Sequence, residues 1–92
     1  MQYHLFKLPS FVRALKRFLR KHPDLVDAVT DTLEQLQTDP FEPSLRLHSL
    51  TGRLKGLQTV SVSYSYRIVL CVEIIDREVI LHNIGSHDEV YS

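Results

Sequence analysis

The sequence contains very little cysteine and no long apolar run. Its single cysteine, Cys71, has no partner for an internal disulfide, and a reducing cytosol is the simplest inference. No apolar stretch approaches the roughly 20 residues that a membrane span needs. The first residues lack a charged region followed by an apolar core, so we expect no signal peptide. These absences predict a cytoplasmic protein that does not bind membranes.

The motifs of several common enzyme classes are missing as well. The histidines do not have the spacing of metal ligands and no second cysteine is present, so we expect no zinc site and no other metal centre. There is no glycine-rich phosphate-binding loop and no Ser-His-Asp order. We therefore expect a protein that needs no cofactor.

The chain does have the apolar content of a folded domain. With 92 residues and 43% apolar side chains, we expect a single domain, residues 1–92, with a modest core. The formal net charge is zero, but residues 1–22 carry six basic and no acidic side chains, and residues 23–44 carry six acidic and no basic ones. Either the two segments neutralise each other, or the basic segment forms a surface for phosphate groups.

The first half of the chain predicts a strand followed by two helices. Residues 2–7 alternate as a short strand. Ser10 is a natural N-cap for an amphipathic helix, which Pro23 stops. Acidic residues then open a second helix, which ends near Asp39, and the short link predicts an antiparallel helix hairpin. A basic stripe runs along one face of the first helix: Arg13, Lys16, Arg17 and Arg20.

The second half predicts three strands joined by short turns. Residues 59–64 alternate cleanly, residues 66–74 are nearly continuous apolar β-formers, and residues 78–84 return after a tight turn. Residues 39–52 form a connection with little regular signal, which is either a functional loop or a loop pinned by its leucines. The expected fold is therefore α+β, in the order β-α-α-β-β-β, with an antiparallel sheet and the helix hairpin packed on one face.

Side-chain alternation assigns the two faces of this sheet. Arg67, Ser61 and Ser63 are expected on the face without helices, and Cys71 is expected in the core. Four apolar residues of the central strand are expected to meet the helices: Ile68, Leu70, Val72 and Ile74.

A cluster of reactive side chains follows the last strand. After Gly85 come His87, Asp88, Glu89 and Tyr91. The histidine titrates near neutral pH when unperturbed and suits acid–base chemistry, the alternative being an exposed residue of the tail. The tyrosine can either stack on a base or anchor the C-terminal segment. The two acids are expected to cap a last helical turn or to face solvent.

Further candidates lie upstream of the tail. His48, in the irregular connection, is either a catalytic partner of His87 or a loop-packing residue. Arg53 and Lys55 flank a turn bracketed by glycines, and Arg67 begins a strand. Cations around a polar sheet face can hold phosphates, the alternative being ordinary solvated charge.

Three ordered motifs resemble the RelE/ParE superfamily of bacterial toxins from toxin–antitoxin pairs. They are residues 48–56 (HSLTGRLKG), residues 65–69 (SYRIV) and residues 84–91 (IGSHDEVY). The β-α-α-β-β-β order of the superfamily also matches, so the resemblance covers essentially the whole chain. It implies a ribosome-dependent endoribonuclease that cuts mRNA, inhibits translation and is neutralised by a cognate antitoxin.

The resemblance also implies functional residues. YafQ-like members keep functional histidines at the positions of His48 and His87 and an aromatic residue at Tyr91. RelE-like members are similar at Arg67 and at Tyr91. Lys55 lies in the Gly-x-x-Lys-Gly stretch of YafQ-like chains.

Several positions depart from both branches of the superfamily. Thr59, Ser61 and Ser65 stand where YafQ-like enzymes carry an acid, a histidine and an aspartate. Ser61, Ser63 and Ser86 stand where RelE-like enzymes carry basic residues. Either the tail histidine and the strand-start arginine carry the activity, or the activity is weak or absent.

Attack of a ribose 2′-OH on the adjacent phosphate is the leading hypothesis, and it needs no metal. His87 would be a general acid or base with His48 as its partner, and Tyr91 would stack on the RNA or orient it. The phosphate would be held by Arg67, Arg53 and Lys55, and the basic stripe would contact rRNA. The rivals are a ParE-like inhibitor of DNA gyrase that cuts no RNA and an inactive relic kept for antitoxin binding.

Overall fold

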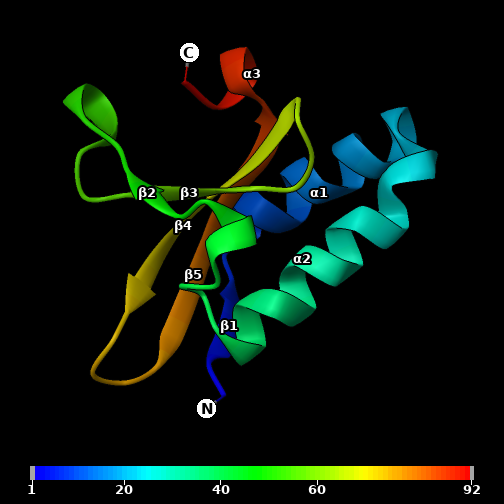
Figure 1. The fold of residues 1–92 in the computed structure, drawn as a ribbon. Coiled ribbons are helices and arrows are strands. Elements are labelled where there is room, and N and C mark those ends of the chain that lie inside the picture. The colour runs from blue at the N-terminus through cyan, green and yellow to red at the C-terminus, as the bar shows by residue number, and fades with distance from the viewer. Residues whose placement is uncertain (1, 92) are drawn as a thin grey trace.

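A computed structural model describes residues 2–91 and shows two long helices on one side of a single sheet (Figure 1). The ends of the predicted domain, Met1 and Ser92, lie outside the described residues. No helix within residues 2–91 is long and apolar enough to cross a membrane.

The two helices form the predicted hairpin. α1 (Pro9–Lys21) and α2 (Val26–Thr38) are joined by a short 3₁₀ turn, Pro23–Leu25. The N-cap of α1 is Leu8, so the N-cap prediction for Ser10 is wrong. Proline suits the first helical position because no N–H donor is needed there. The Ser10 hydroxyl instead donates to the backbone carbonyl of His82 at 2.9 Å and ties the helix to the last strand.

The sheet has five strands in the order β1-β5-β4-β3-β2. Their bounds are β1 His4–Lys7, β2 His48–Ser49, β3 Gln58–Ser61, β4 Tyr66–Glu73 and β5 Glu78–Ser86. The predicted antiparallel meander of β3, β4 and β5 is confirmed, and the unpredicted two-residue β2 extends it by pairing antiparallel with β3. β1 runs parallel to β5, which makes the sheet mixed. A parallel pair needs a long crossover, and the helix hairpin with β2, β3 and β4 provides it.

The core lies between the helices and one face of the sheet. It joins Phe11, Phe18 and Leu36 of the helices to Ile68 and Leu70 of β4, as the alternation predicted, with Val72 packed partly against it. Two face predictions fail. Ile74 lies beyond the end of β4 in an exposed turn, and Cys71 is only half-buried.

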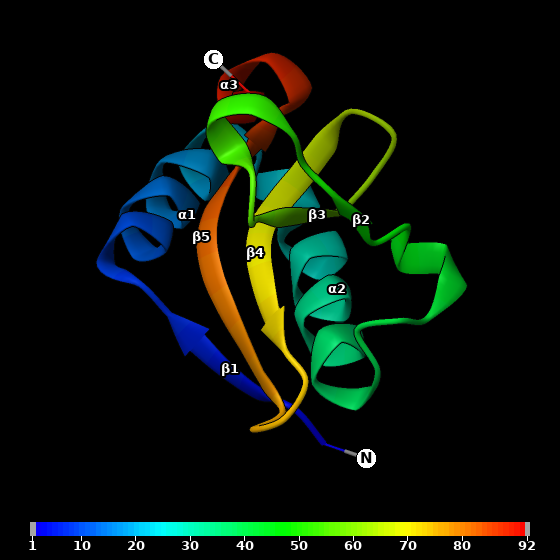
Figure 2. The ribbon, with the colours of Figure 1, turned by 90° about the vertical axis from the view of Figure 1, so that its left-hand side faces the viewer.

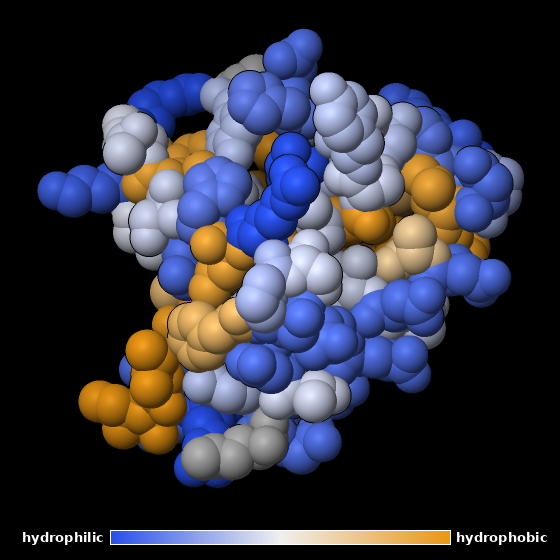
Figure 3. Space-filling model, viewed as in Figure 1, coloured by the Kyte–Doolittle hydropathy of each residue, from blue (hydrophilic) through white to orange (hydrophobic). Residues whose placement is uncertain are grey.

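The β4–β5 turn exposes apolar side chains. Ile74 is 63% exposed and Ile75 is 89% exposed. The turn projects from the lower end of the sheet, where Figure 3 shows an apolar patch.

The connection after α2 is partly ordered by short elements. It contains the 3₁₀ turn Pro43–Leu45, then β2, then the 3₁₀ turn Gly52–Leu54. Leu45 is buried in the core and Leu47 packs against it, as expected for a pinned loop. A last short helix, α3 (His87–Tyr91), continues directly from β5 and buries Val90. The Gly52–Leu54 turn and α3 line one cavity at the same end of the sheet, and Figure 2 shows the turn in front of α3.

Candidate active site

The sheet face opposite α1 and α2, called the open face here, carries Thr59, Ser61 and Arg67. A cavity of about 430 Å³ lies where the Gly52–Leu54 turn and β2 meet α3. Four of the predicted site residues line it together: His48, Arg53, His87 and Tyr91. The structure thus joins residues that are far apart in the sequence.

His48 is held by its strand and by two hydrogen-bonding groups. It pairs with Thr59 in the β2–β3 register. Its Nδ1 lies 3.1 Å from the carbonyl oxygen of Arg46, and Thr59 Oγ1 lies 3.3 Å from Nε2 and 3.5 Å from Nδ1. A carbonyl only accepts, so this contact assigns the proton to Nδ1 and leaves Nε2 as an acceptor. This acceptor nitrogen faces the Thr59 hydroxyl.

His87 and Tyr91 lie one helical turn apart on the same side of α3. Their ring centroids are 4.2 Å apart at 78°, an edge-to-face contact. The Asp88 carboxylate lies 3.6 Å from Nδ1 of His87 and is otherwise exposed, so it faces solvent as expected. The tyrosine ring and this carboxylate together orient an exposed imidazole.

α3 starts with a capping box. The Ser86 amide donates to Glu89 Oε1 at 2.8 Å, and the Glu89 amide donates to Ser86 Oγ at 3.2 Å. Hydrogen bonds from the Ser86 amide and from the Ser86 side chain to the Glu89 carboxyl lower its pKa, burial partly offsets them, and Lys21 and His22 contribute less. The prediction that Glu89 caps a last helical turn is confirmed.

Gly85 allows α3 to fold tightly onto the end of β5. A Cβ at this position would lie 3.0 Å from Glu89 Oε1 and 3.2 Å from Glu89 Cβ. These distances are tighter than nine in ten real Cβ contacts, so with a larger residue here Glu89 would have to give way by a few tenths of an ångström. The glycine that precedes the reactive tail therefore allows Glu89 to approach the end of β5 closely.

Arg53 links the Gly52–Leu54 turn, which lines the cavity, to α3. Its Nη2 donates to the backbone carbonyl of Tyr91 at 3.5 Å. Gly52 and Gly56 have φ of 67° and 97°, in the left-handed region that favours glycine, so the glycine bracket shapes this turn. Lys55 is exposed beside the turn and is not part of the cavity lining.

Arg67 is on the open face as predicted, but it is not among the residues that line the histidine cavity. Its Nη1 donates to the carbonyl oxygens of Ser63, Tyr64 and Tyr66 at 3.1, 3.3 and 3.3 Å, and so clamps the β3–β4 turn. It lines a second cavity, of about 350 Å³, together with Arg46 and Ser61.

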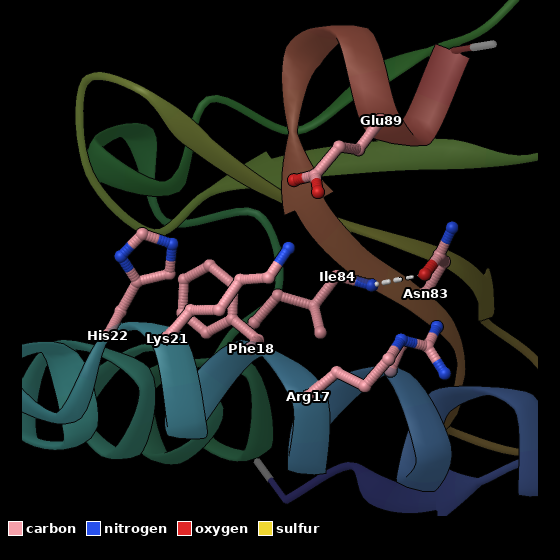
Figure 4. Close-up of a pocket in the computed structure, with 8 residues that line it drawn as sticks. Arg17, Phe18, Lys21, His22, Asn83, Ile84 and Glu89 are labelled. Atoms are coloured by element: carbon pink, nitrogen blue, oxygen red, sulfur yellow. Dashed lines mark hydrogen bonds between the residues drawn. The ribbon is translucent and has the colours of Figure 1, made fainter.

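The four residues of the basic stripe, Arg13, Lys16, Arg17 and Arg20, are all exposed on α1. Figure 4 shows a third, smaller cavity, which is lined by Arg17 and Lys21 of α1, by His22 just after it, and by Asn83 and Glu89. The His22 ring packs against Phe18 and Tyr66, with centroids 4.8 and 4.7 Å away. These ring contacts pack the C-terminal end of α1 against the end of the sheet at which the histidine cavity lies.

Sequence reasoning missed two residues that organise the site. Thr59 was noted only as a departure from relatives, and only the pairing of β2 reveals its contact with His48. Ser86 was noted only as a departure from relatives. The Ser-x-x-Glu spacing of residues 86–89 is a signal that could have identified it.

No protein-family model and no curated protein sequence matches the chain. Solved structures do match over nearly the whole length. The solution structure of the conserved hypothetical protein HP0894 from Helicobacter pylori is 26% identical, covers 98% of this chain and 99% of its own, and has a TM-score of 0.76. E. coli YafQ is 15% identical, with coverage of 99% and 100% and a TM-score of 0.73.

A third match is the toxin–antitoxin complex RelBE2 from Mycobacterium tuberculosis. It is 18% identical, covers 95% of this chain and 100% of the matched chain, and has a TM-score of 0.74. The three matches cover between 95% and 99% of this chain, so the likeness is one of the overall fold.

Proposed function

We propose that this chain, which belongs by its fold to the RelE/ParE toxin superfamily, is the toxin of a bacterial toxin–antitoxin pair and a ribosome-dependent mRNA endoribonuclease. The observation that carries the proposal is the shared cavity of His48, His87, Arg53 and Tyr91. Two imidazoles with a cation and an aromatic ring suit acid–base cleavage of a phosphodiester. Residues 1–92 would act as a single domain in the cytoplasm.

The proposed reaction uses the two imidazoles as base and acid. Nε2 of His48 takes the proton of a ribose 2′-OH, and O2′ then attacks the adjacent phosphorus. The P–O5′ bond breaks, and protonated His87 gives its proton to the leaving O5′. The products are a 2′,3′-cyclic phosphate and a 5′-OH end, with no metal involved.

The other residues of the site hold and orient the RNA. Arg53 faces the same cavity and stabilises the charge that develops on the phosphate. Tyr91, beside His87, stacks on a base or orients the strand. Lys55 at the rim and Arg67 in the neighbouring cavity contact flanking phosphates. The ribosome supplies positioning, so a site with few groups suffices.

The basic stripe of α1 contacts rRNA, and an acidic segment of the cognate antitoxin competes for it or for the open face around Arg67. The four exposed cations Arg13, Lys16, Arg17 and Arg20 support this assignment. The matched M. tuberculosis structure is a toxin–antitoxin complex, which supports a partner of this kind. The antitoxin segment would fold as it binds.

Induction of the chain in bacterial cells tests the proposal. Mapping of transcript 5′ ends should reveal new ends in translated mRNA within minutes, together with growth arrest. Arrest with DNA damage and no new transcript ends would instead identify a gyrase inhibitor. No arrest at all would identify a relic and overturn the enzymatic assignment.

A further inference from the structure

The second cavity of the open face has the composition of a nucleotide subsite. It has a volume of about 350 Å³ and lies beside the β3–β4 turn. Tyr64, Arg46 and Arg67 line it, with the serines of β3 and the turn. No carboxylate lies among the described residues that line it. The cleavage chemistry at the two histidines does not account for this arrangement.

Tyr64 is the most unusual member of the cavity. It is 97% exposed, although burial of an aromatic ring is strongly favourable. Within residues 2–91 it makes no ring–ring contact. An exposed aromatic ring beside cations is the usual platform on which proteins stack a base of single-stranded nucleic acid.

The ring is mounted on a turn that is held in place. Arg67 Nη1 donates to three carbonyls of the turn, including that of Tyr64 itself at 3.3 Å. The Val62 amide closes the turn by donating to the Tyr66 carbonyl at 2.9 Å. A turn fixed in this way loses little freedom when a ligand binds, and this favours affinity.

The cavity also offers groups that recognise phosphate. Arg46 is exposed, and within the described residues no hydrogen bond uses Nη2 or Nε of Arg67. Ser61 and Ser63 add hydroxyl donors at the same cavity. Guanidinium and hydroxyl groups are the common partners of phosphate oxygens.

The backbone connects this cavity to the histidine cavity. The Arg46 carbonyl binds the His48 ring, and Thr59, which contacts that ring, is two residues from Ser61 along β3. Two residues of strand span roughly 7 Å. One extended strand of RNA can therefore reach both cavities.

We propose that Tyr64 and Arg46 bind the base and phosphate of a nucleotide next to the cleaved one, in single-stranded RNA. The identity of the ligand rests on the proposed function. Stacking accepts every base, so the subsite adds affinity and sets the register of the strand without reading its sequence.

Binding of a short fluorescein-labelled RNA with 2′-O-methyl riboses, which cannot be cleaved, tests the subsite by fluorescence anisotropy. Y64A should weaken binding about 5- to 150-fold, the range for one stacked base, whereas Y64F, which keeps the ring, should bind like the unaltered chain. R46A should reduce the slope of log affinity against log salt by about 0.7.

R77A is the matched control for Arg46. Both arginines are exposed and have positive φ, 54° for Arg77 and 53° for Arg46, but Arg77 lies in the β4–β5 turn. R77A should leave both the affinity and the salt slope unchanged.

Two results overturn the subsite: equal binding by Y64A and Y64F, or no binding of the RNA by the unaltered chain. Cleavage of mRNA on ribosomes is measured separately with the same proteins. Loss of binding in Y64A without any cleavage by the unaltered chain would refute the proposed enzyme and leave the subsite standing.

Discussion

Ser86 and Glu89 bind each other's backbone amides, at 3.2 and 2.8 Å, and this reciprocal pair fixes the start of the helix that carries His87 and Tyr91. The pair anchors the start of α3, which forms one wall of the cavity. The direction of α3 follows from these two hydrogen bonds within residues 86–89, and the position of the His87 ring therefore depends on them.

Removal of the cap should destabilise the chain measurably. Ser86→Ala deletes the oxygen that accepts the Glu89 amide, and loss of an N-cap costs about 1 kcal/mol. Urea denaturation should show this decrease in the free energy of unfolding. Ser86→Thr, which keeps the hydroxyl, should have nearly the same free energy of unfolding as the unaltered chain. Equal losses in both variants would contradict the capping assignment.

Acid should abolish the contribution of Glu89. Its carboxyl pKa is lowered in the folded chain from the ordinary value of 4.5, mainly by the hydrogen bonds from Ser86. The stabilisation is therefore complete above pH 4.5 and is lost as the pH falls through the folded pKa. Urea denaturation of the unaltered chain and of Glu89→Gln at several pH values checks this. The difference in unfolding free energy between the two proteins should be constant near neutral pH and should shrink in acid. A difference that does not change with pH would refute the contribution of the ionised Glu89 carboxylate.

Gly85→Ala should displace α3. The new methyl group would meet Glu89 Cβ at 3.2 Å, and such crowding costs about 1–3 kcal/mol. We expect lower stability and shifted amide resonances in residues 87–91. Gly56→Ala is the control, because its φ of 97° strains alanine with nothing within 4 Å of the new group. That variant should lose stability without moving the α3 resonances. Unmoved resonances in Gly85→Ala would be evidence against the close approach.

Thr59→Val should show whether the Thr59 hydroxyl positions the His48 ring or whether residue 59 only fills space in the sheet. Valine keeps the shape of this fully buried side chain but removes the hydroxyl beside the imidazole. Loss of one hydrogen bond, about 1 kcal/mol, predicts roughly 5-fold slower mRNA cleavage in a translation extract. Thr59→Ser keeps the hydroxyl and should cleave at nearly the normal rate. Full activity in Thr59→Val would exclude a role for this contact.

Much of the fold was predictable because its signals are local. Alternation in residues 59–64 and the apolar run of β4 identify the meander, and prolines mark where the helices stop. The predicted strand is too long at its end, because β3 stops at Ser61 and residues 62–65, including Ser63, form the turn to β4. The direction of β1 is set by a long crossover, which no local pattern encodes. The same holds for β2, whose two residues are too short to leave a periodic signal.

The site was predictable as a set of residue types but not as an arrangement. His48 and His87 were paired as candidates, and they do line one cavity. Arg67 was grouped with the two histidines, but it lines the second cavity instead. The sequence does not reveal this, because the direction of the guanidinium depends on the carbonyls of the β3–β4 turn. Thr59, which looks like a lost catalytic position, contacts the His48 ring instead.

The central claim is that His48 and His87 act together on RNA, and transcript 5′-end mapping after induction tests it most directly. His4→Ala, which removes an exposed histidine of β1, is the control and should leave new ends and growth arrest unchanged. His48→Ala and His87→Ala, at equal soluble levels, should each reduce the new ends by about 100-fold or more, since acid–base groups contribute 10²–10⁴-fold. Undiminished cleavage in the double variant would contradict the account.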